Sequence, residues 1–457
     1  MKRVGILGHV GNKNLGDEAI IAAVIQGVRR RCPDAQLCGF TANPDDTTAR
    51  HGIAASAIRR GSTRPGSPRV TTGSGAASRG AGSIKGALKR VPVVFAGLSG
   101  LRDAARAVRG VLAEAWFLVR SYRALRGLDL LIVAGSQQLS DNIGGPWSFP
   151  YTLLKWSLLA RAARAQVVYL SVGAGPITSR LSRRFLRWAL ATASYRSYRD
   201  VGSQQLIAEI GGPTHDPVVP DLVHGLDTTG PASRSRRSGD PLVVGINPMP
   251  FADPRFWHEA DTATYDHYVR TLAAFAGWLM ASGRDVLFYP TQLRADPPVI
   301  SDIRSVLKQT SPAGFERRIV ERPIDSFDDL VSAIAAADIV VPTRFHGIVL
   351  GFLLGKPVLG IAYHPKARDL MAQMDQSDYV VDVDPLDLAA LQNRFTALAA
   401  NRERSARQIE VHSAACRRLL DAQYETVAQL LNGAGLTPAS RNDRVAVPSA
   451  LGERRSS

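Results

Sequence analysis

An arginine and a histidine stand two residues apart in the segment PTRFHG at 342–347. A guanidinium group binds a carboxylate or phosphate through parallel hydrogen bonds, and an imidazole exchanges a proton near neutral pH. Arg344 and His346 could therefore bind an anion and transfer a proton to it, which makes them our catalytic candidates. The residue types alone leave a second interpretation open, in which His346 caps a helix and Arg344 is solvated.

Two further cations follow predicted strands. Arg199 stands in SYRDVGS (197–203), where Asp200 is a suitable N-cap for the next helix, and Lys366 ends the segment YHPK (363–366). Side chains at the carboxyl ends of parallel strands face the cleft in which open α/β sheets bind ligands. We therefore expect Arg199 and Lys366 to bind the substrate, with a structural ion pair as the alternative for Arg199.

Two loops supply the remaining candidates for substrate binding. The loop GHVGNKNLGDE (8–18) joins a predicted strand to a helix, and its glycines would let backbone amides approach an anion. It is neither a Walker A loop nor a GxGxxG fingerprint. We select Asn12, Gly16 and Asp17 from it, although a tight turn with an acidic first helical turn is an equal alternative. In AGSQQLSD (134–141), Asp141 could bind a sugar hydroxyl or cap the next segment.

Alternating strands and helices would position these residues. Near-continuous apolar strands between amphipathic helices are typical of parallel sheets covered on both faces. In the first half the predicted strands are 4–7, 36–40, 128–134, 166–172 and 195–198, with helices 17–31, 151–163, 181–192 and 201–210. In the second half they are 242–246, 285–289, 317–321, 339–342 and 357–361, with helices 263–281, 299–308, 326–336, 347–354 and 403–431.

The chain is predicted to form two α/β domains that face a cleft. We assign residues 1–227 to the first domain and 242–436 to the second. The segment 228–241 (TTGPASRSRRSGDP) has the composition of a linker, and 437–457 is expected to be a disordered tail. Length alone, at 457 residues, already favours more than one domain.

The charge of the chain is concentrated in one insertion. The net charge is +16, and residues 59–126 carry 14 basic and 2 acidic residues. We expect a mobile loop at 61–90, which is rich in Gly, Ser, Arg and Pro, and a basic amphipathic helix at 100–126. Such a helix either lies on an anionic membrane surface or packs on the domain with a solvated basic face. We expect peripheral contact with an anionic membrane and no nucleic-acid partner, although a non-catalytic anion or nucleic-acid binder is one rival interpretation.

Cysteine content and hydropathy indicate the compartment. Three cysteines (Cys32, Cys38 and Cys416) do not make a disulfide framework, so a reducing compartment fits. We find neither a signal peptide nor an apolar run long enough to span a bilayer, and we predict a cytoplasmic protein. No HxH, HExxH or CxxC cluster suggests a metal site.

Five segments in order resemble the polysaccharide pyruvyl transferase family. They are GNKNLGDEAI, GSQQLSDNIGG, YRDVGS, VVPDLVHG and PTRFHG…YHPKARDLM, and the resemblance spans Val4–Met374 except for the basic insertion. It implies two Rossmann-like domains arranged as in GT-B glycosyltransferases. It also implies transfer of a pyruvyl group from phosphoenolpyruvate to a saccharide as a ketal, with release of phosphate. Arg199, Arg344 and His346 match the family positions for phosphoenolpyruvate binding and catalysis, and Lys366 matches a recurring one.

One departure and one rival accompany this resemblance. Residues 134–136 read AGS where the family usually has three glycines, which puts acceptor binding at Asp141 in doubt. The rival is a glycosyltransferase of the same fold that uses a nucleotide-sugar, because fold does not set function. The implied reaction needs no cofactor or metal, since side chains supply the positive charge. The acceptor could be a lipid-linked oligosaccharide, a cell-wall polymer unit or a free sugar.

Overall fold

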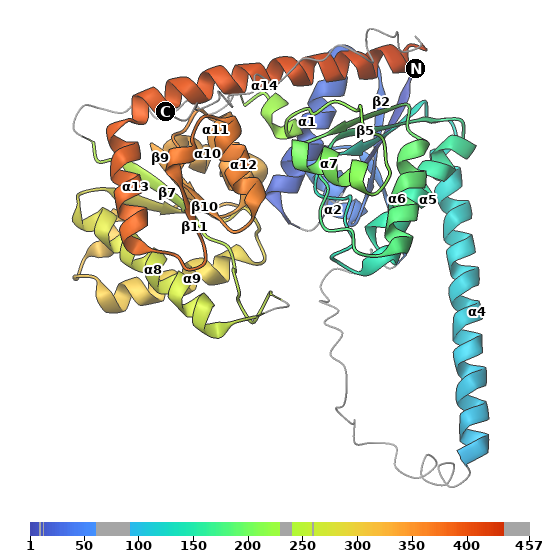
Figure 1. Ribbon diagram of the computed structural model, residues 1–457, viewed down its shortest axis with the longest axis horizontal. Coiled ribbons are helices and arrows are strands. Elements are labelled where there is room, and N and C mark those ends of the chain that lie inside the picture. Colours follow the sequence, from blue (N-terminus) through green and yellow to red (C-terminus); the bar gives the residue numbers. More distant parts are fainter. Residues whose placement is uncertain (9–10, 12, 61–91, 229–239, 258–259, 434–457) are drawn as a thin grey trace, which may run out of the picture.

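The computed structural model describes residues 1–8, 11, 13–60, 92–228, 240–257 and 260–433, with side chains from Val108 onward in the stretch after 92. The N-terminal half is built on a six-stranded parallel sheet of order β3-β2-β1-β4-β5-β6 (Figure 1). Its strands are β1 (Arg3–Leu7), β2 (Gln36–Thr41), β3 (Ala54–Ala57), β4 (Leu130–Ala134), β5 (Gln166–Val172) and β6 (Tyr195–Tyr198). This strand order is that of the Rossmann fold, with its topological switch between β1 and β4.

Helices cover both faces of this sheet. Successive residues of a strand point to opposite faces, so Ile132 packs with the first helix while Leu131 and Val133 pack on the other side. The helices of this half are α1 (Leu15–Arg31), α2 (Pro44–His51), α4 (Pro92–Leu125), α5 (Phe149–Ala162), α6 (Arg180–Ala191) and α7 (Val201–Glu209). Burial on both faces explains why the strands read as continuous apolar runs.

The C-terminal half repeats this design with a smaller sheet. Its central part has the order β8-β7-β9, and a bridge between Val340 and Val358 leads from β9 toward the pair β10-β11. The strands are β7 (Val243–Asn247), β8 (Asp285–Phe288), β9 (Ile339–Pro342), β10 (Gly360–Ala362) and β11 (Val380–Asp382). The helices are α8 (Thr262–Ala281), α9 (Asp296–Thr310), α10 (Phe327–Ala336), α11 (Phe345–Leu353), α12 (Pro365–Gln373), α13 (Leu388–Ala400) and α14 (Arg402–Leu431).

The long helix α14 runs from the C-terminal half across to the N-terminal sheet (Figure 1). Near its end, Gln423 hydrogen-bonds to Ser197, and the Tyr424 hydroxyl donates to the Ala23 carbonyl of α1 over 3.2 Å. One continuous hydrophobic core includes α1, α14 and the helices α10 and α11 of the other half. The two halves are therefore packed together at the rear of the cleft. The division at 1–227 and 242–436 stays a prediction, since the segment 229–239 and the tail 437–457 lie outside the described residues.

The structure confirms the predicted α/β class with two parallel sheets and corrects one local prediction. The predicted strand at 317–321 is wrong, because residues Phe315–Arg318 form a 3-10 helix and only Ile319 makes a bridge, to Val286. Arg317 and Arg318 would have placed two charges in a buried strand, which the short helix avoids.

The structure also separates the two interpretations of the basic helix, α4. Among the described side chains its apolar face is exposed rather than packed on the domain, with Leu112 at 63% and Trp116 at 64% of full exposure. Figure 1 shows α4 extending away from the body of the N-terminal half. The loop expected at 61–90 lies outside the described residues. Within the described part of the chain, no helix is both long and apolar enough to cross a membrane.

The contact between α1 and α14 depends on a glycine. A Cβ atom at Gly27 would lie 2.4 Å from the buried Tyr424 ring, whereas one at Gly277 in α8 would meet nothing closer than 3.7 Å. We predict that Gly27→Ala lowers the free energy of unfolding by about 1–3 kcal/mol. The matched Gly277→Ala control should be neutral or slightly stabilising, because alanine is the better helix residue. Urea unfolding of both variants checks this, and equal effects would contradict the packing described.

Candidate active site

A buried carboxylate joins the two halves at the centre of the cleft. Asp221 Oδ2 lies 3.2 Å from Arg199 Nη1 and 4.0 Å from His346 Nε2. Arg199 follows β6 of the N-terminal half, and His346 stands in the first turn of α11 of the C-terminal half. The Arg199 guanidinium also lies over the Phe345 ring, 4.5 Å from its centroid, in a cation–π contact. Arg199 and Asp221 are 7% and 4% exposed, so they interact with little screening by water.

Arg344 is positioned by a second buried carboxylate. Its Nε and Nη2 donate to Asp296 Oδ1 over 3.0 and 2.5 Å. The other oxygen of Asp296 accepts from the backbone amides of Thr291 and Gln292, over 2.9 and 2.8 Å. Asp296 is fully buried at the start of α9. This support fixes Arg344 at the N-terminus of α11, beside His346.

The first turn of α1 completes the site from the opposite side. The Leu15 amide donates to the Thr291 carbonyl over 2.8 Å, and Asn14 pairs with Gln292 in an antiparallel bridge between the halves. Gly16 then lies directly against His346, because a Cβ atom at Gly16 would be 2.4 Å from the imidazole ring. Only glycine allows this approach, which explains the residue that sequence reasoning selected.

Asp17 is a weak acid in this environment. Its carboxylate accepts a hydrogen bond from Asn14 Nδ2 over 2.8 Å. Burial, followed by the charges of Glu18 and Asp221, raises the pKa of Asp17 to about 7, although Arg199 and Asn14 act in the opposite direction. An acid with this pKa can donate or accept a proton at neutral pH. Glu18 has a local role instead, since it accepts from the Gly11 amide and contacts His51.

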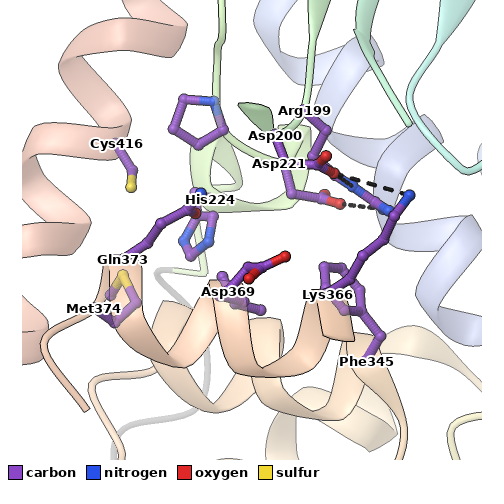
Figure 2. Close-up of a pocket in the computed structure, with 12 residues that line it drawn as sticks. Arg199, Asp200, Asp221, His224, Phe345, Lys366, Asp369, Gln373, Met374 and Cys416 are labelled. Atoms are coloured by element: carbon purple, nitrogen blue, oxygen red, sulfur yellow. Dashed lines mark hydrogen bonds and ion pairs between the residues drawn. The ribbon is translucent and has the colours of Figure 1, made fainter. Parts of the chain in front are cut away.

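Lys366 reaches across the cleft from α12. Its ammonium donates to the carbonyl of Ala174 in the N-terminal half and lies 4.0 Å from Asp200 Oδ2. Figure 2 shows Lys366 and Phe345 directed toward Arg199 and Asp221. Burial lowers the pKa of Lys366 to about 8, and the positive charge of Arg199 acts in the same direction. This contact closes the cleft on one side.

A small cavity lies beneath these groups. It has a volume of about 20 Å³, which is room for roughly one water molecule. Its walls come from both halves and from α14, and they include His224, Asp369, Gln373, Met374 and Cys416 (Figure 2).

The two buried histidines are neutral in this state. Burial lowers the pKa of both His346 and His224 to about 4, against the attraction of Asp221. For His346, the positive charges of Arg199 and Arg344 lower the pKa further. His346 Nε2 and Arg199 Nε are buried and have no hydrogen-bond partner among the described residues. Buried polar atoms without partners are rare, and these two lie at one point of the cleft, where a ligand would satisfy them.

The structure thus brings most of the predicted residues into one site. Arg199, Arg344, His346 and Lys366 converge on it, with Gly16 and Asp17 from the facing loop. Asn12 lies outside the described residues. The roles predicted for these side chains in binding and catalysis stay predictions.

Asp141 has a different environment. Its carboxylate accepts hydrogen bonds from the amides of Thr178 and Ser179, the latter over 2.8 Å, and so holds the segment that leads into α6. Burial alone would raise the pKa of Asp141, but these amides lower it below its usual range. Asp141 therefore holds a segment 37 residues further along the chain and does not cap the next one, and its role in acceptor binding stays a prediction.

Sequence reasoning missed the carboxylates that organise the site. Asp221 stands in the segment VVPDLVHG, whose resemblance was noted without a role for the residue, and His224 belongs to the same segment. Asp296 stands in RADPP, which resembles an ordinary helix start with an acidic residue before proline. No local pattern distinguishes Asp296, because its partner Arg344 lies 48 residues away in the sequence.

The raised pKa of Asp17 gives a testable pH dependence. Because this pKa lies above the unfolded value near 4, the folded protein binds more protons between the two values, and stability falls as the pH rises through 7. We expect Asp17→Asn to raise the Tm more at pH 8 than at pH 5. The exposed Asp34→Asn variant is the control. An equal shift of Tm at both pH values would show that Asp17 is an ordinary surface acid.

Comparisons with known proteins agree with this fold. The chain is similar to HepE from Anabaena, whose structure contains UDP and glucose, with 14% identity, a TM-score of 0.51, and coverage of 95% of this chain and 100% of the other. It is also similar to a putative UDP-N-acetylglucosamine 2-epimerase from Listeria monocytogenes, with 10% identity, a TM-score of 0.54, and coverage of 95% and 98%. At such identities these matches show the fold alone, which is GT-B-like.

The sequence itself gives a family. No curated protein matches the chain. The family model described as polysaccharide pyruvyl transferase matches residues 14–365, which contain Gly16, Asp17, Arg199, Asp221, Arg344 and His346 and end just before Lys366. This match covers most of the chain and, apart from Lys366, the residues that converge in the cleft. The chain therefore belongs to the polysaccharide pyruvyl transferase family, and it is a transferase.

Proposed function

We propose that the protein transfers a pyruvyl group from phosphoenolpyruvate to a saccharide acceptor, as a ketal, with release of phosphate. The observation that carries the proposal is the pair of arginines, Arg199 and Arg344, which reach the position of His346 from opposite halves of the cleft. Phosphoenolpyruvate has a phosphate and a carboxylate, so two guanidinium groups complement its two anionic ends. Lys366 adds a third cation at the edge of the same site.

The reaction can be written with these groups. A hydroxyl of the acceptor loses its proton and adds to C2 of the enol phosphate, while the acid delivers a proton to the methylene carbon C3, which becomes the methyl group. A second hydroxyl then replaces the phosphate at C2, loses its proton and closes the ketal. His346 is our choice for the acid of the first step. No metal or cofactor is needed, because the arginines balance the negative charge of phosphoenolpyruvate.

The neutral state of His346 fits a substrate-dependent acid. With a pKa near 4 in this structure, His346 is the neutral imidazole at neutral pH, which is a poor proton donor. A bound anion would offset the charges of Arg199 and Arg344, and an opposite charge nearby favours the protonated imidazole. The substrate itself would then promote protonation of the His346 imidazole, which stays neutral when no substrate is bound.

The acceptor is a saccharide of a cell-surface polysaccharide, and a lipid-linked oligosaccharide is one form of it. The enzyme acts in the cytoplasm. The test is release of phosphate from phosphoenolpyruvate across an acceptor panel, followed by mass analysis of the product. We expect a gain in mass that corresponds to one pyruvyl ketal. Turnover of a nucleotide-sugar, with no phosphate release from phosphoenolpyruvate, would instead support the glycosyltransferase rival.

Replacement of His346 tests the assigned acid. His346→Ala should lower kcat for phosphate release by at least about 100-fold, the range typical of a lost general acid. His215→Ala, at an exposed histidine outside the site, is the matched control and should retain the wild-type rate. A near wild-type rate for His346→Ala would refute the assignment.

The titration of His346 can be followed directly. We predict that phosphoenolpyruvate raises the pKa of His346 from about 4, as observed by NMR of the imidazole with His346→Gln as the assignment control. His224, which is also buried, should shift less, because its pKa is lowered by burial and by Arg417 rather than by the two arginines of the site. If phosphoenolpyruvate bound without a change in the pKa of His346, substrate activation of the acid would be disproved.

A further inference from the structure

Helix α4 presents a continuous strip of apolar side chains to solvent. We call these five residues the apolar strip: Val108, Val111, Leu112, Trp116 and Val119, which are 57%, 68%, 63%, 64% and 43% exposed. Their spacing places them on one side of the helix. Single exposed apolar residues are ordinary, but five on one helix face indicate an interaction surface.

The orientation of α4 is fixed by contacts on its other side. Glu114 accepts from Lys155 over 3.0 Å and from the Tyr151 hydroxyl over 3.3 Å, both on α5. The Lys155 ammonium lies 4.6 Å from the centroid of the Phe117 ring, and Leu125 is fully buried. The helix therefore cannot roll to bury the apolar strip against its own domain without breaking these contacts.

The charges around the apolar strip favour an anionic partner. Arg120 and Arg123 are exposed on the same helix, and the Arg123 guanidinium lies 6.0 Å from the Trp116 ring centroid. The nearest acid, Glu114, is directed toward Lys155 and is neutralised there. A second copy of the chain would bring a like-charged helix against this one, which disfavours self-association.

We propose that α4 docks on an anionic lipid bilayer, with the apolar strip at the boundary between headgroups and acyl chains. Arginines flanking such a strip bind lipid phosphates, and a tryptophan is favoured at this interface. With 34 residues, α4 is about 50 Å long, enough to lie along the surface beside the domain. The docking is independent of the chemistry proposed for the cleft.

The test is cosedimentation of the full-length protein with phosphatidylcholine vesicles that contain 30% phosphatidylglycerol, compared with pure phosphatidylcholine. The protein should partition to the anionic vesicles and be released by high salt. Leu112→Glu should lower partitioning at least about tenfold, because it replaces an apolar side chain that would enter the bilayer by a charged one. Val411→Glu on α14, at 68% exposure, is the matched control and should leave partitioning unchanged.

A second pair of variants separates charge from apolar contact. Arg120→Gln with Arg123→Gln should reduce binding by roughly fivefold for each arginine, whereas Arg270→Gln on α8, at 73% exposure, should reduce it by less than twofold. Equal binding of wild type and Leu112→Glu would overturn the proposal, and so would equal binding to neutral and anionic vesicles. A dimer in sedimentation velocity that Leu112→Glu converts to a monomer would overturn it in favour of self-association.

Discussion

The carboxylate of Asp221 is the interaction on which the site depends. It is buried, and it contacts Arg199 from its own half and His346 from the other half. Burial alone would raise the pKa of Asp221, but the charge of Arg199 and the backbone amide of Val223 lower it. Removal of one member of a buried charged pair leaves the other without compensation, which is why such a cluster specifies a single arrangement. The relative position of the two halves and the geometry of the site are thus set by the same atoms.

The rest of the fold holds this arrangement closed. The bridge between Asn14 and Gln292 fixes the start of α1 next to the loop that positions Asp296, and Asp296 in turn holds Arg344. At the rear, α14 joins both halves through one continuous core. Because Lys366 also spans the cleft, substrate entry requires movement of the front contacts while the rear packing is retained. The smallness of the cavity is a consequence of this closure.

Much of the fold was predictable because the strands of a parallel sheet are buried on both faces and read as apolar runs. Strands β5, β6 and β9 match the predicted bounds, and Arg199, Arg344 and His346 were selected because they follow strands. The predicted strand at 317–321 failed where the apolar signal was short and flanked by charges. Asp221 and Asp296 were missed because their roles arise from partners far away in sequence. For α4 the sequence left two interpretations open, because periodicity shows that a helix has an apolar side but not what covers it.

The basic side chains of the chain lie in two different settings. The arginines of the cleft are paired with buried aspartates, whereas those of α4 are exposed. The most direct test of the central claim is calorimetric titration of phosphoenolpyruvate into the wild-type protein and into Arg199→Gln and Arg344→Gln. The account predicts binding at one site per chain, weakened at least about tenfold by either substitution. Absence of binding to the wild type, or equal affinity in all three proteins, would contradict it.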